Sequence, residues 1–226
     1  MKLYTHPVST ASRPVALLIA EKNLPVTSEI VDLMTGAQYQ EPYVSMNPNS
    51  MVPMLEDGDF RLTESSAILK YLADRFDLPE YPKDLKARAH VNEVMDWFNS
   101  NVYRDYGYNM IYPQLFPHHN RGNDAVQAAV IDWGHKKSLR WLQLLNDAWI
   151  GPKKDYLCGD SITIADYFAS GIVTLGDVVG CDFAAYPNIT RWLGKIKALP
   201  SWKPVHQVFD GWVSSVAEKD RLVAVR

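Results

Sequence analysis

The spacing of apolar positions divides the chain into a first part that alternates strands with helices and a second part that is entirely helical. Residues 2–5 and 25–33 carry the short apolar runs that are typical of strands. The helix predicted between them places Val15, Leu18 and Ile19 on one face. A strand, a helix and a second strand in this order predict a βαβ unit with parallel strands.

A β-hairpin and a helix are predicted next. Residues 51–62 form two strand-like runs around Asp57-Gly58-Asp59, and an Asp-Gly pair in that setting is a strong hairpin signal. A weak helix is predicted near 37–44, and an amphipathic helix follows over 64–75. The first part is therefore βαβαββα, with a mixed sheet in which an antiparallel hairpin extends a parallel pair.

Only helical patterns follow a linker that contains two prolines. We therefore predict an α+β protein of two domains, with residues 1–78 as the mixed domain, 79–86 as the linker and 87–226 as an all-helical domain. The aromatic-rich stretch of the helical domain is expected to be interrupted at Gly107 and Pro113.

Two further helices have readable packing signals. The helix over 123–149 is expected to bury Val126 and Trp133 among its core positions. Thr163 and Asp166 form a capping box at the start of a later helix, which is most simply a structural device.

Composition and charge exclude several classes of protein. The chain is 47% hydrophobic and 12% aromatic, which supports a large folded core. A net charge of −3 and a pI near 6.1 argue against a protein that binds nucleic acid without regard to sequence. No apolar run predicts a membrane span or a signal peptide. Cys158 and Cys181 have no metal-like spacing and are interpreted as buried reduced thiols of a cytoplasmic protein.

Ser9 is the strongest candidate for chemistry. It lies between a strand end and a helix start, where a hydroxyl can point at a ligand while backbone dipoles favour negative charge. A serine in such a loop is also a common N-cap, and Thr10 and Ser12 are rivals on the same loop. No Gly-x-Ser-x-Gly motif surrounds Ser9, so a hydrolase triad is poorly supported.

Two other segments have the chemistry of a peptide-binding site. A cis Val52-Pro53 bond would leave the backbone of Val52 free to pair with an extended ligand, although an ordinary trans proline fits the residues equally well. The Ser65 hydroxyl and N–H could hold a carboxylate, and Glu64 could hold an amine beside it. Simple helix capping is the alternative role for Glu64 and Ser65.

Histidines and aromatic residues are the remaining candidates. His118 and His119 are adjacent and no cysteine or acidic cluster joins them, so we expect a solvated loop rather than a metal site. The aromatic residues nearby form either core or an apolar cleft. They are Tyr103, Tyr106, Tyr108, Tyr112, Phe116 and Trp133.

Four segments together resemble the soluble glutathione transferases, and within them the serine-type theta, phi and delta classes. They are the Ser9 loop at 6–13, the NP…VP segment at 47–53, the LEDGD…ES.AI..YL run at 55–72 and the capping-box segment at 159–166. The resemblance covers nearly the whole chain. It implies a thioredoxin-like first domain, an all-helical second domain and a cytoplasmic homodimer that needs no metal.

The resemblance also assigns roles to residues. Glutathione is the implied co-substrate, with its sulfur at Ser9, its cysteinyl backbone at Val52 and its γ-glutamyl end at Glu64-Ser65. Its full set of implied contacts is Gln38, Met51, Val52, Pro53, Glu64 and Ser65. The nominated electrophile contacts are Val8, Met34, Tyr108, Tyr112 and Trp212.

Two of these positions depart from the family pattern. Gln38 stands where related sequences commonly have histidine, and Met51 stands where they often have lysine or glutamine. Both changes weaken polar contacts to the glycyl end of glutathione. The predicted function is the addition of a glutathione thiolate, activated by Ser9, to small hydrophobic electrophiles by conjugation or dehalogenation. A glutathione-dependent peroxidase or isomerase and a non-catalytic binding domain remain as alternatives.

Overall fold

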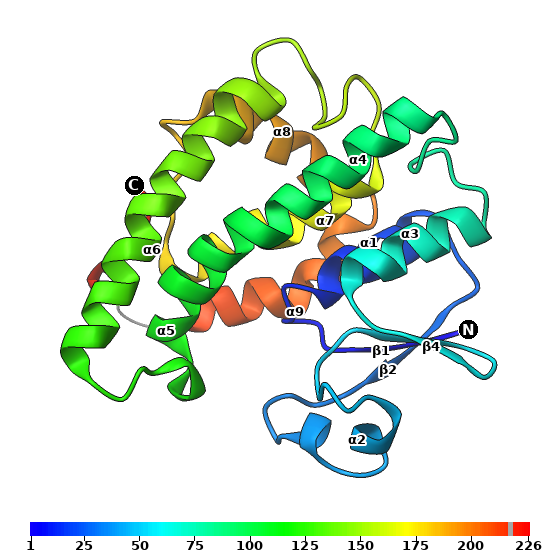
Figure 1. Ribbon diagram of the computed structural model, residues 1–226, viewed down its shortest axis with the longest axis horizontal. Coiled ribbons are helices and arrows are strands. Elements are labelled where there is room, and N and C mark those ends of the chain that lie inside the picture. The colour runs from blue at the N-terminus through cyan, green and yellow to red at the C-terminus, as the bar shows by residue number, and fades with distance from the viewer. Residues whose placement is uncertain (217–218) are drawn as a thin grey trace.

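The first domain is built on a four-stranded sheet in the order β2-β1-β3-β4. The protein is represented by a computed structural model that describes residues 1–216 and 219–226 (Figure 1). The strands are β1 (Lys2–Thr5), β2 (Thr27–Ile30), β3 (Met54–Asp57) and β4 (Phe60–Leu62). β2 runs parallel to β1, whereas β3 is antiparallel to both β1 and β4. The predicted mixed sheet is therefore confirmed.

Helices cover both faces of this sheet, which explains why successive residues of β1 are both buried. Leu3 belongs to the main core with α1 (Ser12–Glu21) and α3 (Ser65–Arg75). Tyr4 points to the opposite face and packs in a small cluster with Tyr43 of α2 (Tyr43–Met46). Side chains of a strand alternate between faces, so each face receives its own layer of helix.

The second domain is entirely helical in the part of the chain that the structure describes. Its α-helices are α4 (Leu85–Trp97), α5 (Tyr112–Leu115), α6 (Asp124–Leu144), α7 (Ile164–Val173), α8 (Pro187–Lys197) and α9 (Trp202–Ser215). The two-domain fold class is confirmed, whereas the predicted linker at 79–86 stays a prediction. No helix within residues 1–216 and 219–226 is long and apolar enough to span a membrane.

The expected interruption of the first long helix is wrong. α4 continues directly into a π-type segment over Phe98–Ile111, and α5 follows without a loop. Gly107 lies inside this segment. Its lack of a side chain leaves room for the Tyr103 ring, which a Cβ at this position would approach to 2.6 Å. Pro113 lies in the first turn of α5, directly after the π-type segment, so the continuous helix lacks one backbone hydrogen bond at this point without being broken.

The expected burial of Val126 and Trp133 on α6 is also wrong. Their side chains are 49% and 57% exposed. α6 packs against the π-type segment on its other side, at Gly134, where a Cβ would lie only 2.7 Å from the backbone of Asn109. This close approach turns Val126 and Trp133 to the outside.

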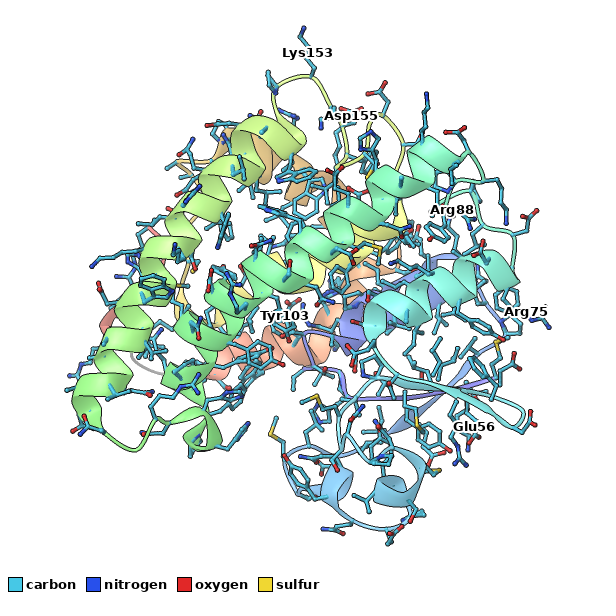
Figure 2. All side chains as sticks on the ribbon, in the orientation of Figure 1. Glu56, Arg75, Arg88, Tyr103, Lys153 and Asp155 are labelled. Carbon is cyan, nitrogen blue, oxygen red and sulfur yellow. The ribbon has the colours of Figure 1, made fainter. Side chains whose placement is uncertain are left out.

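One continuous core joins the two domains. It runs from Leu3 and α1 through α4 and α7 to Phe209 on α9. Labelled charged side chains such as Glu56 and Lys153 lie at the outside of the molecule, whereas Tyr103 lies toward the middle of the view (Figure 2). The two domains therefore share one hydrophobic interior instead of touching through a polar surface.

The predicted capping box at the start of α7 is confirmed. The fully buried carboxylate of Asp166 accepts hydrogen bonds from the N–H and the hydroxyl of Thr163, at 2.8 and 3.0 Å. It also accepts from the N–H of Leu157 at 2.8 Å and from Nε1 of Trp192 at 2.9 Å. Asp166 thus joins α7 to α8 and to the preceding loop.

Replacing Asp166 with alanine should lower the free energy of unfolding by about 3 kcal/mol or more, because several buried donors lose their acceptor. Urea denaturation measures this loss. Asp132→Ala is the matched control, since it removes an exposed carboxylate whose only ion pair among the described residues is with Lys136 on the same helix. That control should change stability by less than about 0.5 kcal/mol. Equal losses for the two variants would contradict the role given to Asp166.

Candidate active site

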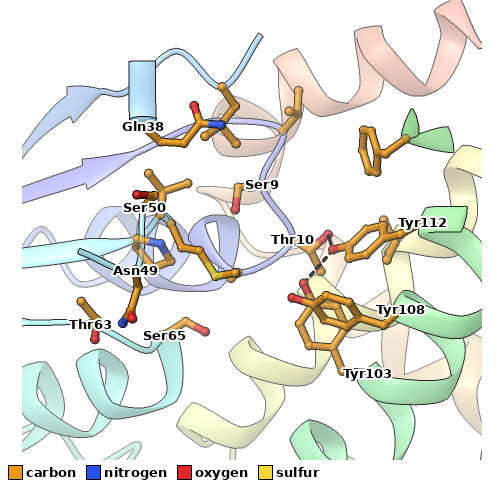
Figure 3. A pocket seen from close by; sticks show the side chains of 18 of the residues that line it. Ser9, Thr10, Gln38, Asn49, Ser50, Thr63, Ser65, Tyr103, Tyr108 and Tyr112 are labelled. Atoms are coloured by element: carbon orange, nitrogen blue, oxygen red, sulfur yellow. Dashed lines mark hydrogen bonds between the residues drawn. The ribbon is translucent and has the colours of Figure 1, made fainter. Parts of the chain in front are cut away.

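A cavity of about 460 Å³ lies between the two domains (Figure 3). It is lined by every residue that the sequence predicted to contact glutathione or an electrophile. These are Val8, Ser9, Met34, Gln38, Met51, Val52, Pro53, Glu64, Ser65, Tyr108, Tyr112 and Trp212. The first domain supplies the polar wall, and the tyrosines of the helical domain face it across Ser9.

Ser9 lies three residues before the first residue of α1. Its Oγ accepts a hydrogen bond from the N–H of Ser12 at 3.2 Å, whereas the N-cap position itself is Ala11 and has no side-chain cap. A hydroxyl that accepts one hydrogen bond keeps its own proton free to donate. Ser9 lines the cavity, so its hydroxyl can donate to a ligand while its oxygen accepts from Ser12.

The loop before β3 presents an unpaired backbone to the cavity. The Val52-Pro53 bond is cis, which decides between the two alternatives above. The carbonyl oxygen of Met51 is held by the hydroxyl of Tyr43 at 2.5 Å and by Nδ2 of Asn47 at 2.8 Å. Within the described chain, neither the N–H nor the C=O of Val52 makes a hydrogen bond. Both groups are available to an extended peptide-like ligand.

The start of α3 is a second open site. Glu64 precedes the helix with a φ of 64°, and no side chain caps the helix start. Among the N–H groups of the first turn in the described chain, only that of Ile68 makes a backbone hydrogen bond, which goes to the carbonyl oxygen of Glu64. The Ser65 hydroxyl lines the cavity, and the remaining N–H groups point out of a helix end that favours negative charge. The alternative of simple side-chain capping is therefore wrong for Glu64.

The opposite wall carries a chain of hydroxyl groups. Tyr112 donates to Oγ1 of Thr10 at 3.0 Å, and the hydroxyl of Tyr103 lies 2.6 Å from that of Tyr112. Because Tyr112 uses its proton on Thr10, Tyr103 is the donor in that second bond. Burial raises the pKa of Tyr112 to about 12 and the pKa of Tyr103 well above its ordinary value. These phenols stay neutral at physiological pH.

The rest of this wall is aromatic. Tyr108 packs edge-on against Tyr112, with ring centroids 5.1 Å apart, and burial raises its pKa too. His119 packs on both tyrosines, and burial lowers its pKa, so its ring is neutral. The expectation of a solvated loop is therefore wrong for His119. No group of three metal-binding side chains occurs among the residues that the structure describes.

A buried cation lies behind the Ser9 loop. Arg13 is 1% exposed, and its guanidinium donates to Oγ1 of Thr174 at 2.9 Å and to the carbonyl of Gly171 at 3.1 Å. Its guanidinium carbon lies 3.5 Å from the ring centroid of Phe209. Burial lowers the pKa of Arg13 to about 10, so it remains charged at pH 7. No carboxylate in the described chain lies within ion-pair distance of it.

The sequence did not assign roles to Arg13, Tyr103 or Thr10. Arg13 resembles an ordinary polar residue at a helix start, and its partners lie about 160 positions away. Thr10 was considered only as a rival of Ser9. The spacing of Tyr103 from Tyr108 was the one signal present, because residues five apart share a face in a π-type turn.

Comparisons with known proteins show which family the chain resembles. A family model described as the glutathione S-transferase N-terminal domain matches residues 1–74, and the corresponding C-terminal domain matches residues 124–200. Human glutathione S-transferase theta-1 is 31% identical over 88% of this chain and 82% of its own length. Rat glutathione S-transferase theta-1 is 30% identical over the same shares of each chain.

Solved structures show the same likeness. Human glutathione transferase theta-2, in complex with glutathione and an unknown ligand, superposes with a TM-score of 0.83 at 26% identity. That match covers 100% of this chain and 93% of the human one. A delta-class glutathione transferase of Nilaparvata lugens has a TM-score of 0.81 at 28% identity and covers 96% and 99% of the two chains.

The hydroxyl chain predicts a particular response to alkaline pH. The phenol of Tyr112 titrates near pH 12 when folded and near pH 10 when unfolded. Its contribution to stability is therefore complete below about pH 10 and is lost as the pH rises toward 12. Tyr112→Phe should be less stable than wild type at pH 8, and the two melting temperatures should converge above pH 10.

Circular dichroism at a series of pH values measures the two melting temperatures. Tyr39→Phe is the control, because the Tyr39 ring is 67% exposed. The melting temperature of Tyr39→Phe should differ from that of wild type by the same amount at every pH. A difference between the melting temperatures of Tyr112→Phe and wild type that stays constant above pH 10 would contradict the shifted titration of Tyr112.

Proposed function

The chain belongs to the glutathione S-transferase family, and from this premise we propose a theta-like enzyme in which Ser9 activates the thiol of glutathione. The observation that carries the proposal is the position of the Ser9 hydroxyl. This hydroxyl accepts a hydrogen bond from the N–H of Ser12, which leaves its own proton free to donate. It also lines the cavity between the two walls. An uncharged donor of this kind stabilises a thiolate without taking up its proton.

The polar wall suits a γ-glutamyl-cysteinyl-glycine peptide. The free N–H groups and the hydroxyl at Ser65 bind the γ-glutamyl carboxylate, and Glu64 pairs with the amine beside it. The unpaired N–H and C=O of Val52 bind the cysteinyl backbone. Pro53, Gln38 and Met51 complete this wall toward the glycyl end. This arrangement places the sulfur at Ser9.

The proposed reaction is a substitution or addition at an electrophilic carbon. The glutathione thiol gives its proton to water, and the thiolate forms a bond from sulfur to carbon. In a dehalogenation the carbon–halogen bond breaks and halide leaves with the bonding electrons. The electrophile lies against Val8, Met34, Tyr108, Tyr112 and Trp212, which are largely aromatic or apolar.

The proposal extends to the assembly and the location of the protein. We expect residues 1–78 and 87–226 to act as the two functional domains of a homodimer in the cytoplasm. Phe60 on β4 is 44% exposed and packs in a tilted arrangement against Tyr71 of α3, so it gives the outer side of the first domain an apolar anchor. Light scattering should give a mass of about twice 25.6 kDa for wild type and a smaller mass for Phe60→Glu. A monomeric wild type would contradict the dimer.

Ser9→Ala should lower kcat/KM for glutathione and an aryl halide by about 100-fold, because one preorganised donor to the anion is lost. The loss should appear in kcat. Ser65→Ala should instead raise KM for glutathione and leave kcat nearly unchanged, because it removes a contact made equally before and during reaction. Steady-state kinetics with both substrates varied separate the two effects.

Thr10→Val tests the neighbouring hydroxyl under the same conditions. Thr10 accepts a hydrogen bond from Tyr112, and its loss should reduce activity less than the loss of Ser9. Melting temperatures of all three variants correct for the hydrogen bond that Ser9 also makes to the N–H of Ser12. Equal activities for wild type and Ser9→Ala would overturn the proposed role of Ser9.

A further inference from the structure

The three tyrosines of the aromatic wall differ in where their hydroxyl protons go. Tyr112 donates to Oγ1 of Thr10 at 3.0 Å, and Tyr103 donates to Tyr112 across 2.6 Å (Figure 3). A phenol has only one proton to donate. The protons of Tyr103 and Tyr112 are therefore both used within the wall, and Thr10 is the acceptor at which this chain of hydroxyl groups ends.

Tyr108 is the exception among the three. It lines the cavity, and its hydroxyl points into the cavity beside that of Tyr103 (Figure 3). Within the described chain, Tyr108 donates its proton to no other residue. Burial raises the pKa of Tyr108, the Tyr103 hydroxyl lowers it as a neighbouring donor does, and Glu64 of the polar wall raises it. Tyr108 is thus a neutral phenol with a proton that a ligand can accept.

Aromatic contacts hold Tyr108 in this position. Its ring lies edge-on to Tyr112 and His119, with centroid distances of 5.1 and 5.6 Å. The ring of Tyr103 packs against it at 5.0 Å. A donor that is fixed before the substrate arrives needs no reorganisation when negative charge develops in front of it.

The place of Tyr108 relative to the sulfur decides which charge it can meet. The inference rests on the proposed function, which puts the thiolate at Ser9, so an electrophile lies between Ser9 and the tyrosines. Attack by sulfur on an α,β-unsaturated carbonyl moves negative charge to the carbonyl oxygen, on the side away from the sulfur. None of the described residues that line the cavity is lysine or arginine, so a neutral donor has to meet this charge.

We propose that Tyr108 is the acid for α,β-unsaturated carbonyl electrophiles, and that Thr10 fixes this assignment by accepting the proton of Tyr112. The thiolate sulfur forms a bond to the β-carbon, and the electron pair of the carbon–carbon double bond moves toward the carbonyl oxygen. That oxygen takes the proton of Tyr108, and water returns a proton to the phenolate. The resulting enol then rearranges to the saturated ketone.

Two electrophiles with the same thiol test the role of Tyr108. Benzylideneacetone needs a proton on its oxygen, whereas iodomethane releases iodide with the bonding electrons and needs none. Tyr108→Phe should lower the ratio of kcat/KM for benzylideneacetone to that for iodomethane about 100-fold, the usual cost of one lost donor to an oxyanion. Tyr81→Phe is the matched control, because it removes a buried hydroxyl that bonds to Asn92 outside the cavity, and it should keep the wild-type ratio.

Thr10→Val tests the direction of the hydroxyl chain. It removes the acceptor of Tyr112 at nearly constant side-chain volume and so frees one phenol proton in the wall. Added to Tyr108→Phe, it should raise the ratio about tenfold, because a freed donor in a less favourable place restores part of the lost stabilisation. A threonine that only supports the fold would give no such recovery.

Equal ratios for wild type and Tyr108→Phe would overturn the role of Tyr108, and a double variant without recovery would overturn the role of Thr10. Both results would leave the role of Ser9 intact, because the ratio cancels changes in the thiolate. Failure of wild type to turn over either electrophile with glutathione would overturn the proposed function and this inference together. Melting temperatures confirm that each variant is folded.

Discussion

The contact between the start of α1 and α7 is the constraint on which the site depends. Gly171 of α7 has no side chain at the point where a Cβ would lie 2.5 Å from the ring of Pro14 and 2.7 Å from the carbonyl of Thr10. Arg13 crosses the same contact and is bound by Thr174 and Gly171. The loop that carries Ser9 is thereby fixed against the helical domain, between the two walls of the cavity.

This contact also sets the electrostatics of the site. Arg13 is a buried cation without a carboxylate partner in the described chain, and it lies one helical turn from Ser9. The start of α1 contributes a positive dipole end at the same place. An anion at Ser9 is thus favoured by the surroundings, and the Ser9 hydroxyl adds a directed donor. The neutral tyrosines across the cavity leave the opposite side apolar enough for a hydrophobic electrophile.

Much of the polar wall could be predicted from the sequence, because its residues lie in short segments with local rules. The Asp57-Gly58 hairpin, the open start of α3 and the Ser9 loop all depend on neighbours a few positions away. Arg13 could not be predicted, because its burial depends on Gly171 and Thr174, which are distant in the chain.

The aromatic wall shows a different limit of sequence reasoning. Gly107 and Pro113 are helix breakers by propensity, yet both fit inside one long helix once Tyr103 and the first turn of α5 are in place. Trp133 has the spacing of a core residue, but α6 is covered on one side only, so periodicity identified the helix but placed Trp133 wrongly on its buried face.

The most direct test of the account is the pKa of glutathione bound to the enzyme, followed through the ultraviolet absorbance of its thiolate. A free thiol of this kind titrates near pH 8.5. The bound thiol of wild type should titrate at least about one pH unit lower, and Ser9→Ala should return it toward the free value. A bound thiol in wild type that titrates like free glutathione would contradict the central claim.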